Sequence, residues 1–367
     1  MTNNQRLTEI DALRGIAALG VVLFHVKMLF IEDIGLFPRV GPIWVFIEGH
    51  LWSLVDLFFV ISGYVFSHVY LDPAQSLIKR GVTVREYAAA RLGRLYPLHF
   101  ASLIAMTAIV GLSGPFGGGL GLGHILFDMK HFMLNLVFLQ ASGLEDNYSY
   151  NAPAWSLSVE ALCYVLFLML ARKGGAWLLY GAVALALIGV VNGSPITGYF
   201  SIKIARGLAG FFLGVLLYRY RKQADLIPTP ALVAFTLLML WKSPGLFHLL
   251  QMNDGIRMSV AVWPAVICLT QRAPFNSLLR IPGFATLGDL SYSMYLCHTP
   301  VIFAMVAWNG TVQFHHDQIW LVTPIFLAAT LTLSWLSYRY FETPMRHAIR
   351  GWATPTKVSG IAITLKS

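Results

Sequence analysis

Charged residues are scarce in this sequence. Asp, Glu, Lys and Arg make up 12% of the 367 residues, whereas apolar residues make up 57%. Both values lie outside the range of soluble globular domains. The composition therefore excludes a soluble nucleic-acid-binding protein, although the formal net charge is +9. In a membrane protein, such a basic excess sets topology and does not indicate a polyanionic partner.

Cysteine is also rare, and no fixed-period repeat is present. The three cysteines, Cys163, Cys268 and Cys297, lie in apolar runs without paired spacing or a neighbouring metal-ligand pattern. We therefore expect no disulfide and no metal site. The first apolar run is too long for a cleavable signal peptide and lacks a small-residue cleavage site. We expect it to remain as a signal anchor.

The sequence is instead rich in apolar runs of membrane-spanning length. They predict an all-α integral membrane protein, a bundle of about ten transmembrane helices. The predicted spans are residues 12–30, 51–70, 95–112, 154–171, 176–191, 200–218, 230–241, 257–271, 288–308 and 319–340. Residues 113–153 form the longest connection, which begins glycine-rich and continues through HFMLNLVFLQ, a re-entrant or interfacial segment too short to span. Residues 1–350 form one transmembrane domain and residues 351–367 a short cytoplasmic tail.

The distribution of basic residues predicts the orientation. With the amino terminus in the cytoplasm, most of the 26 Lys and Arg residues fall in the cytoplasmic loops and termini. Such a bias is the usual determinant of membrane topology. We therefore expect both termini in the cytoplasm.

The first span contains ionisable residues at two depths. Arg14 and His25 are about three helical turns apart, so both project from nearly the same face, with Asp11 close to it. The rise between them is roughly 16 Å. Ionisable residues inside a span indicate function. The alternative is that Arg14 anchors the helix at the headgroups and His25 only packs.

Three further polar residues reach the depth of His25. Asp56 lies inside the outer end of the second span, and Glu160 and Arg206 lie in the outer halves of theirs. Buried charges are unfavourable unless they are paired. Paired, they would fix the tautomer and pKa of the imidazole for general base catalysis. The alternative is a set of ion pairs that pins helices together.

A second cluster lies at the inner end. Arg91 and Arg94 share one helix face, and Asp289 and Glu342 enter or leave the membrane near the level of Arg14. Arginines bind phosphates through bidentate hydrogen bonds. The alternative is that Arg91 and Arg94 are ordinary positive-inside residues.

The two depths suggest a path between them. His298, with Tyr292 and Tyr295 at helical spacing before it, either lines this path or packs as a hydrogen-bonded histidine. A coenzyme A bound at the inner arginines would extend a pantetheine arm of roughly 16 Å. That length matches the rise from Arg14 to His25.

Six segments in order resemble the acyltransferase-3 family of integral membrane O-acyltransferases, over about residues 7–346. They are IDALRGIAALGVVLFHV, VDLFFVISGYVFS, RLGRLYP, PAWSLSVE, LGDLSYSMYLCH and YRYFETP. The resemblance implies a bundle of about ten helices, a bacterial inner-membrane location and the stand-alone type without an SGNH hydrolase-like domain. The family motifs fall on Arg14, His25, Arg91, Arg94, Trp155, Ser156, Ser158, Glu160, Tyr292, Tyr295, His298, Glu342 and Pro344.

The resulting hypothesis is transfer of an acyl group, acetyl in the first place, from cytoplasmic acyl-coenzyme A to a hydroxyl of an extracytoplasmic carbohydrate or glycolipid. His25 acts as general base or transiently carries the acyl group, and Asp56 or Glu160 orients it. Arg14, Arg91 and Arg94 bind the donor phosphates. The remaining path residues are Asp11, Trp155, Ser158, Arg206, Tyr292, Tyr295 and His298, with Arg206 a candidate for stabilising the oxyanion.

Two other classes of protein are compatible with part of the pattern. A secondary transporter or flippase for a lipid-linked sugar shares the buried charges, but such proteins usually contain an internal repeat. A purely structural membrane subunit would gain little from buried ionisable groups. Neither the acceptor sugar nor the oligomeric state is predicted.

Overall fold

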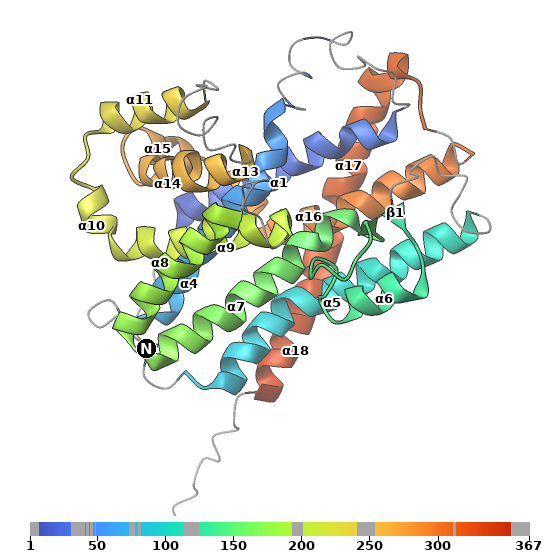
Figure 1. Ribbon diagram of the computed structural model, residues 1–367. Coiled ribbons are helices and arrows are strands. Elements are labelled where there is room, and N and C mark those ends of the chain that lie inside the picture. Colours follow the sequence, from blue (N-terminus) through green and yellow to red (C-terminus); the bar gives the residue numbers. More distant parts are fainter. Residues whose placement is uncertain are drawn as a thin grey trace, which may run out of the picture.

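The protein is an assembly of helices (Figure 1), described here from a computed structural model. The structure describes residues 7–30, 41, 44, 47, 49–72, 78–79, 82–113, 125–192, 201–240, 254–310 and 313–353. The glycine-rich stretch after residue 113 and most of the predicted tail lie outside these ranges. The described chain forms helices throughout, apart from one pair of two-residue strands and its loops.

Seven helical segments among the described residues are long and apolar enough to cross a membrane, judged by length and composition. They are Thr8–Leu29 (α1, Thr8–His25, with η1, Val26–Leu29), Leu51–Tyr70 (η2, Leu51–Ser53, with α4, Leu54–Tyr70), Val84–Leu112 (α5), Ala152–Lys173 (η4, Ala152–Ala154, with α7, Trp155–Lys173), Gly175–Asn192 (α8), Phe284–Trp308 (α16) and His316–Trp352. The last comprises η6 (His316–Gln318), α17 (Ile319–Ser337), η7 (Tyr338–Glu342) and α18 (Thr343–Ala353). A multi-helix membrane protein is thus confirmed.

Helices also occupy the other three predicted spans. They are α9 (Ile202–Arg219), α11 (Thr229–Leu240) and the succession α13 (Asp254–Arg257), η5 (Met258–Val262) and α14 (Trp263–Thr270). Helix α9 carries three basic residues, and α11 has only 12 residues. The count of ten spans therefore stays a prediction. Two short helices, α10 (Arg221–Ala224) and α15 (Phe275–Leu279), connect these elements.

Two helices are longer than the hydropathy pattern predicted. Helix α5 begins at Val84, because Thr83 and Glu86 form a capping box. Arg91 and Arg94 therefore lie two turns inside the helix and not at its start. At the other end of the chain, a π-helical turn, η7, joins α17 to α18, so helix continues to Ala353. The hydropathy pattern did not predict these two extensions, because it detects only apolar segments and the added helical turns are rich in polar residues.

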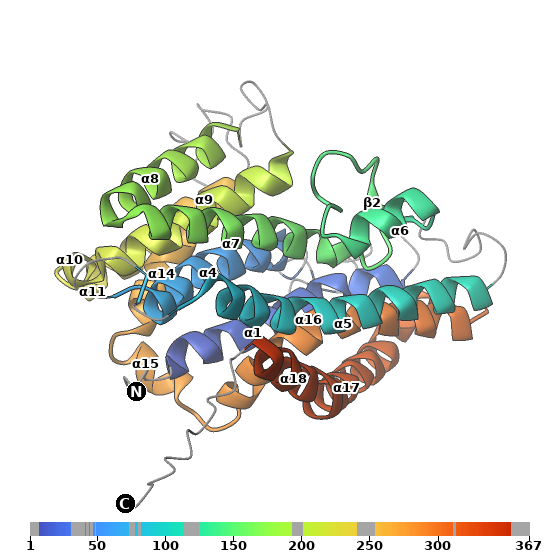
Figure 2. The same ribbon diagram turned by 90° about the horizontal axis from the view of Figure 1, so that it is seen from below.

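The segment between α5 and α7 forms a small polar cap. It contains β1 (Ile125–Leu126), α6 (Met129–Leu136) and β2 (Tyr148–Ser149), and the two strands pair in parallel. The predicted short segment HFMLNLVFLQ thus forms α6 and the turn after it. Figures 1 and 2 place α6 at one end of the bundle and α10 at the opposite end.

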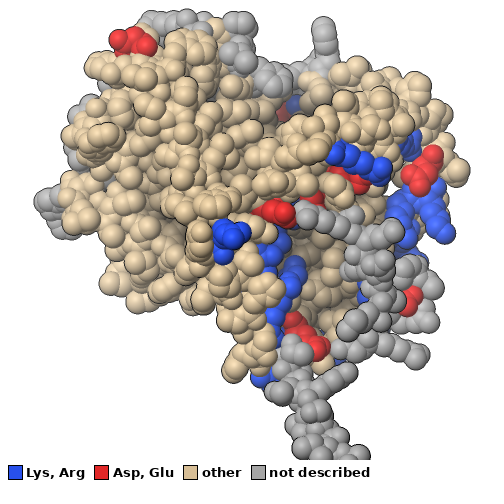
Figure 3. Space-filling view, turned by 180° about the vertical axis from the view of Figure 1, so that it is seen from behind, with Lys and Arg blue, Asp and Glu red and all other residues tan. Residues whose placement is uncertain are grey.

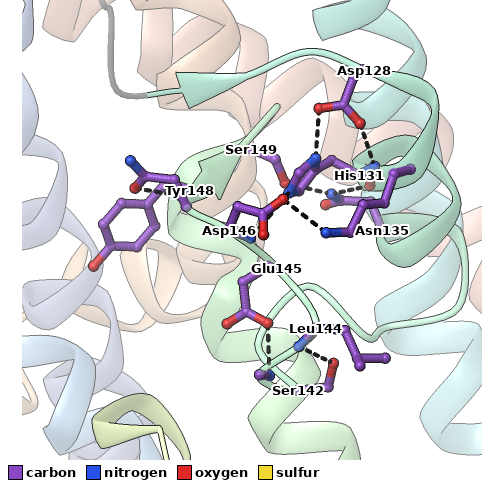
Figure 4. A network of polar contacts seen from close by, with 12 residues as sticks. Asp128, His131, Asn135, Ser142, Leu144, Glu145, Asp146, Tyr148 and Ser149 are labelled. Atoms are coloured by element: carbon purple, nitrogen blue, oxygen red, sulfur yellow. Dashed lines mark hydrogen bonds and ion pairs between the residues drawn. The ribbon is translucent and has the colours of Figure 1, made fainter.

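Polar contacts hold the cap together (Figure 4). His131 Nδ1 lies 2.6 Å from Asp128 Oδ2, and Asn135 donates hydrogen bonds to the His131 carbonyl and to Ser149 Oγ. Lys130 pairs with Asp146 at 2.7 Å. The pKa of Asp128 is lowered, mainly by a hydrogen bond from the backbone N–H of His131, and that of Asp146 is lowered by Lys130. These bonds fix the loop between α6 and β2.

Helices α1 and α16 pack closely because each has a glycine at their crossing. A Cβ on Gly15 would lie 2.5 Å from the Gly288 nitrogen, and one on Gly288 would lie 2.3 Å from the Asp11 carbonyl oxygen. Any larger residue would force the backbones apart. Helices α4 and α9 meet in the same way at Gly63, where a Cβ would lie only 1.8 Å from the Phe211 carbonyl oxygen. These two pairs of helices form the framework of the site.

Candidate active site

A cavity lies inside the bundle between the predicted inner and outer clusters. Its volume is about 100 Å³. Arg14, Arg91 and Arg94 line one part, and Phe58 and Tyr295 line another. The structure therefore brings the three predicted phosphate-binding arginines to one space, although they come from α1 and α5.

A second, polar cavity adjoins the first. Its volume is about 200 Å³, and it shares Arg14 and Arg94 with the first cavity. Asp11, Asp289 and Glu342 also line it. Because two arginines belong to both linings, they stand between the two spaces. A ligand that entered through the second cavity would pass these guanidinium groups to reach the first.

The three arginines have few acceptors of their own. Arg14 lies 3.6 Å from Asp11. The guanidinium of Arg91 lies over aromatic rings, at 4.8 Å from the Phe66 centroid. Arg94 lies within electrostatic range of Glu160 and Glu342, but it has no hydrogen bond or ion pair to any part of the chain that the structure describes. Their N–H donors are thus largely available to an anion.

Glu160 faces the first cavity from α7. Its Oε1 accepts hydrogen bonds from Ser62 Oγ, at 2.7 Å, and from the Tyr164 hydroxyl. Neither of these donors was predicted from the sequence. The spacing of Glu160 and Tyr164, one helical turn apart, would have indicated the second. No described contact joins Glu160 to His25, so the expectation that it orients this histidine is not met.

His25 is held by its own helix. Its Nδ1 donates to the Val21 carbonyl at 2.8 Å, since a carbonyl oxygen can only accept. The proton on Nδ1 leaves the Nε2 lone pair available to receive a proton or to attack a carbonyl carbon. At this residue α1 ends and the tighter turn η1 begins. A backbone carbonyl, and not a carboxylate, therefore sets the tautomer of His25.

His298 lies beside His25, with ring centroids 4.8 Å apart. Its Nδ1 donates to the Met294 carbonyl at 3.1 Å, and its Nε2 lies 3.3 Å from Thr299 Oγ1. Both nitrogens of His298 are therefore engaged, whereas Nδ1 is the one nitrogen of His25 with a partner among the described residues. The ring of Tyr295, which lines the cavity, lies 6.1 Å from that of His298. The histidine pair thus adjoins the cavity through Tyr295.

Asp56 forms an ion pair with Arg206. Two hydrogen bonds of 2.8 and 2.9 Å join the guanidinium to the two carboxylate oxygens, and Asp56 is fully buried. The Arg206 guanidinium lies between the rings of Trp52 and Trp155, 5.2 and 5.1 Å from their centroids. Asp56 therefore does not orient His25, and Arg206 is committed to Asp56. This geometry matches the alternative of an ion pair that pins α4 to α9.

The remaining predicted residues separate into two groups. Tyr292 and Tyr295 line the first cavity, and their hydroxyls donate to the carbonyls of Leu95 and Pro153 at 2.5 and 2.7 Å. Ser156 Oγ lies 2.8 Å from the Tyr295 hydroxyl. Ser158 instead donates to the Phe138 carbonyl at 2.5 Å and so supports the polar cap.

Comparison with known proteins identifies the class. The sequence model of a family described as an acyltransferase domain matches residues 7–339. The chain therefore belongs to the acyltransferase-3 family, and it is an acyltransferase of the membrane-embedded kind. This membership disfavours the transporter and the structural subunit that the sequence left open.

Several curated proteins are similar to the chain. Peptidoglycan O-acetyltransferase OatA of Listeria monocytogenes is 22% identical over 92% of this chain and 55% of its own length. O-acetyltransferase OatA of Staphylococcus aureus is 21% identical over 94% of this chain and 58% of its own. Protein 2 in picA locus of Rhizobium radiobacter is 29% identical over 44% of this chain and 81% of its own. The chain thus spans little more than half the length of the OatA proteins. No solved structure matches it.

Proposed function

We propose that the protein transfers an acetyl group from cytoplasmic acetyl-coenzyme A to a hydroxyl of a carbohydrate or glycolipid on the opposite side of the cell's inner membrane. The observation that carries this proposal is the cavity that the three arginines line, which adjoins the His25 and His298 pair through Tyr295. Its inner part offers guanidinium groups for phosphates, and its lining offers hydroxyls and one carboxylate for the two amides of a pantetheine arm.

The chemistry centres on Nε2 of His25. As a general base, this atom accepts the proton of the acceptor hydroxyl while the hydroxyl oxygen attacks the thioester carbonyl carbon. The C–S bond then breaks, an ester C–O bond has formed, and the proton passes from His25 to the departing thiolate. In the covalent alternative, Nε2 attacks the thioester carbonyl carbon first, and the C–S bond breaks to release the thiolate. The acceptor hydroxyl then attacks the acetyl-imidazole, the N–C bond breaks, and the hydroxyl proton passes to the thiolate. Both routes use the nitrogen that the Val21 hydrogen bond leaves available.

The orientation follows from the charge distribution. Figure 3 shows that charged side chains on this face gather towards the side where Figure 1 places α10 and α18. If this side is cytoplasmic, as the positive-inside rule favours, both termini are cytoplasmic and the polar cap is extracytoplasmic. The name of the Listeria monocytogenes relative, a peptidoglycan O-acetyltransferase, supports a carbohydrate acceptor.

Donor turnover by the purified, detergent-solubilised protein tests the proposal. Acetyl-coenzyme A would be supplied with soluble peptidoglycan fragments as trial acceptors, and free thiol would be followed with time. We expect thiol release that the substitution His25→Ala abolishes while the protein stays folded. An active, normally folded His25→Ala protein would contradict the role of His25. If the unsubstituted protein shows no thiol release and no binding of coenzyme A, the proposed donor is contradicted.

A further inference from the structure

The last helix, α18, packs against the part of α5 that carries the predicted phosphate-binding arginines. A Cβ on Gly93 would lie 3.3 Å from the Ile349 side chain and 3.6 Å from the Arg346 carbonyl oxygen. Arg85 near the start of α5 donates to the Trp352 carbonyl at 2.9 Å. Figure 2 shows α18 beside α5. This helix begins after residue 339, where the match to the family ends.

Arg346 of α18 lines the second cavity and is held there by Glu342. Its Nη2 donates to Glu342 Oε1 at 2.5 Å, and the other oxygen of this carboxylate accepts from Ser293 Oγ at 2.7 Å. Glu342 is 2% exposed. The π-helical turn η7 ends at Glu342 and so places the carboxylate one turn before Arg346. Glu342 thus fixes the guanidinium at the cavity.

Two guanidinium nitrogens in this region are buried without an acceptor. They are Nε of Arg346 and Nε of Arg91. A buried N–H without a partner is unfavourable, so most such groups in proteins are satisfied. Arg91 is held by the rings of Phe66, Tyr70 and Tyr164 and not by a carboxylate. Arg346 lines the second cavity and Arg91 the first, so an anionic group in each cavity would offer an acceptor to the guanidinium there.

The local charge also favours an anion. Arg350 lies within electrostatic range of Arg91, Arg94 and Arg346. Of the carboxylates that line the second cavity, Glu342 is occupied by Ser293 and Arg346, and Asp11 lies at Arg14. Asp289 contributes one further negative charge to this lining. The second cavity itself is lined by three arginines and three carboxylates. With Arg91 and Glu160 of the first cavity and the nearby Arg350, the region holds five arginines and four carboxylates.

We propose that α18 completes the donor site, with Arg346 binding a phosphate of the nucleotide half of coenzyme A beside Arg14 and Arg94, which line the same cavity. This inference rests on the proposed function. The nucleotide half occupies the second cavity, and the pantetheine arm continues past Arg14 and Arg94 into the first. Glu342 is a positioning residue, since it acts through Arg346.

The test compares two donors that differ only in the nucleotide half. KM and kcat for thiol release would be measured with acetyl-coenzyme A and with S-acetyl-pantetheine, which has no phosphate. For Arg346→Gln we expect KM for acetyl-coenzyme A to rise about tenfold with little change in kcat, and no change for S-acetyl-pantetheine. Arg346→Lys keeps the charge but cannot form the bidentate hydrogen bonds of a guanidinium. We therefore expect its KM for acetyl-coenzyme A to lie between those of the unsubstituted protein and Arg346→Gln. Arg339→Gln, an exposed arginine of the neighbouring turn, is the matched control.

Direct binding of coenzyme A, measured by titration calorimetry, separates the two proposals. If the unsubstituted protein binds and turns over the donor while Arg346→Gln matches it for both donors, the role of α18 is overturned and the proposed function stands. Equal losses for both donors would also overturn it, because they would indicate a general structural role. If the unsubstituted protein neither binds nor turns over coenzyme A, both proposals fail. A loss that occurs only in micelles containing phosphatidylglycerol would assign Arg346 to a lipid headgroup and overturn the inference.

Discussion

The rings of His25 and His298 lie 4.8 Å apart at the same distance along two helices that cross at glycine. Each histidine comes ten residues after the crossing glycine of its helix, Gly15 in α1 and Gly288 in α16. Helices in close contact that run in the same direction keep equivalent positions side by side. The glycine contact therefore determines that the two imidazoles meet.

The two histidines are expected to differ in their contribution. His25→Gln should reduce transfer by about 10³-fold or more, because it removes the nitrogen that acts as base or nucleophile. His298→Gln should reduce it about 10- to 100-fold, since both its nitrogens are engaged and it acts by positioning. Initial rates of thiol release check this, with the exposed His316→Gln as control. A larger loss for His298 than for His25 would reverse the assignment.

Substitution at the helix crossing should disturb fold and activity together. The methyl group of Gly288→Ala would lie 2.3 Å from the Asp11 carbonyl oxygen, so α1 and α16 must move apart. We expect a loss of about 1–3 kcal/mol in the free energy of unfolding and reduced turnover. Thermal unfolding in detergent measures the first effect. Gly111→Ala in α5, where nothing lies within 4 Å, should be neutral or slightly stabilising. Unchanged stability of Gly288→Ala would refute the close crossing.

Loss of the Asp56 carboxylate should affect stability more than chemistry. Asp56→Asn leaves the buried Arg206 without its counter-charge, and breaking such a pair costs about 3–5 kcal/mol. Because Asp56 does not contact His25, the protein that remains folded should keep most of its donor turnover. Thermal unfolding and specific activity per folded molecule are the two measurements. The control Asp146→Asn changes an ion pair whose two side chains, those of Lys130 and Asp146, are both exposed, and should lower stability by less than about 1 kcal/mol. Full stability with lost activity would return Asp56 to the catalytic residues.

The polar cap should loosen in acid. The pKa values of Asp128 and Asp146 are lower in the folded protein than their ordinary value of 3.8. The two carboxylates therefore contribute their stabilisation above about pH 4, and the contribution is lost as pH falls through the lower folded values. Hydrogen exchange of residues 125–150, corrected for intrinsic rates, should show weaker protection at pH 3 than at pH 6. Asp128→Asn should reduce this difference, and an equal difference in that variant would contradict the assignment.

Much of the arrangement was predictable from the sequence, because helices are encoded locally. Apolar runs located the helices. The spacing of Arg91 and Arg94 placed both on one helix face, and in the structure they line one cavity together with Arg14. The ordered motifs also pointed to the family that the comparison confirmed. The early start of α5 was encoded as well, in the capping box of Thr83 and Glu86.

The partners of the polar residues were decided only by the tertiary structure. Sequence placed His25, Asp56, Glu160 and Arg206 at a common depth, but depth along a helix does not say which helices adjoin. The glycines of α4 and α9 bring Asp56 to Arg206, while those of α1 and α16 bring His25 to His298. The physical reason is that periodicity fixes a residue's height and face within its own helix, whereas its partner depends on backbone contacts between helices distant in sequence.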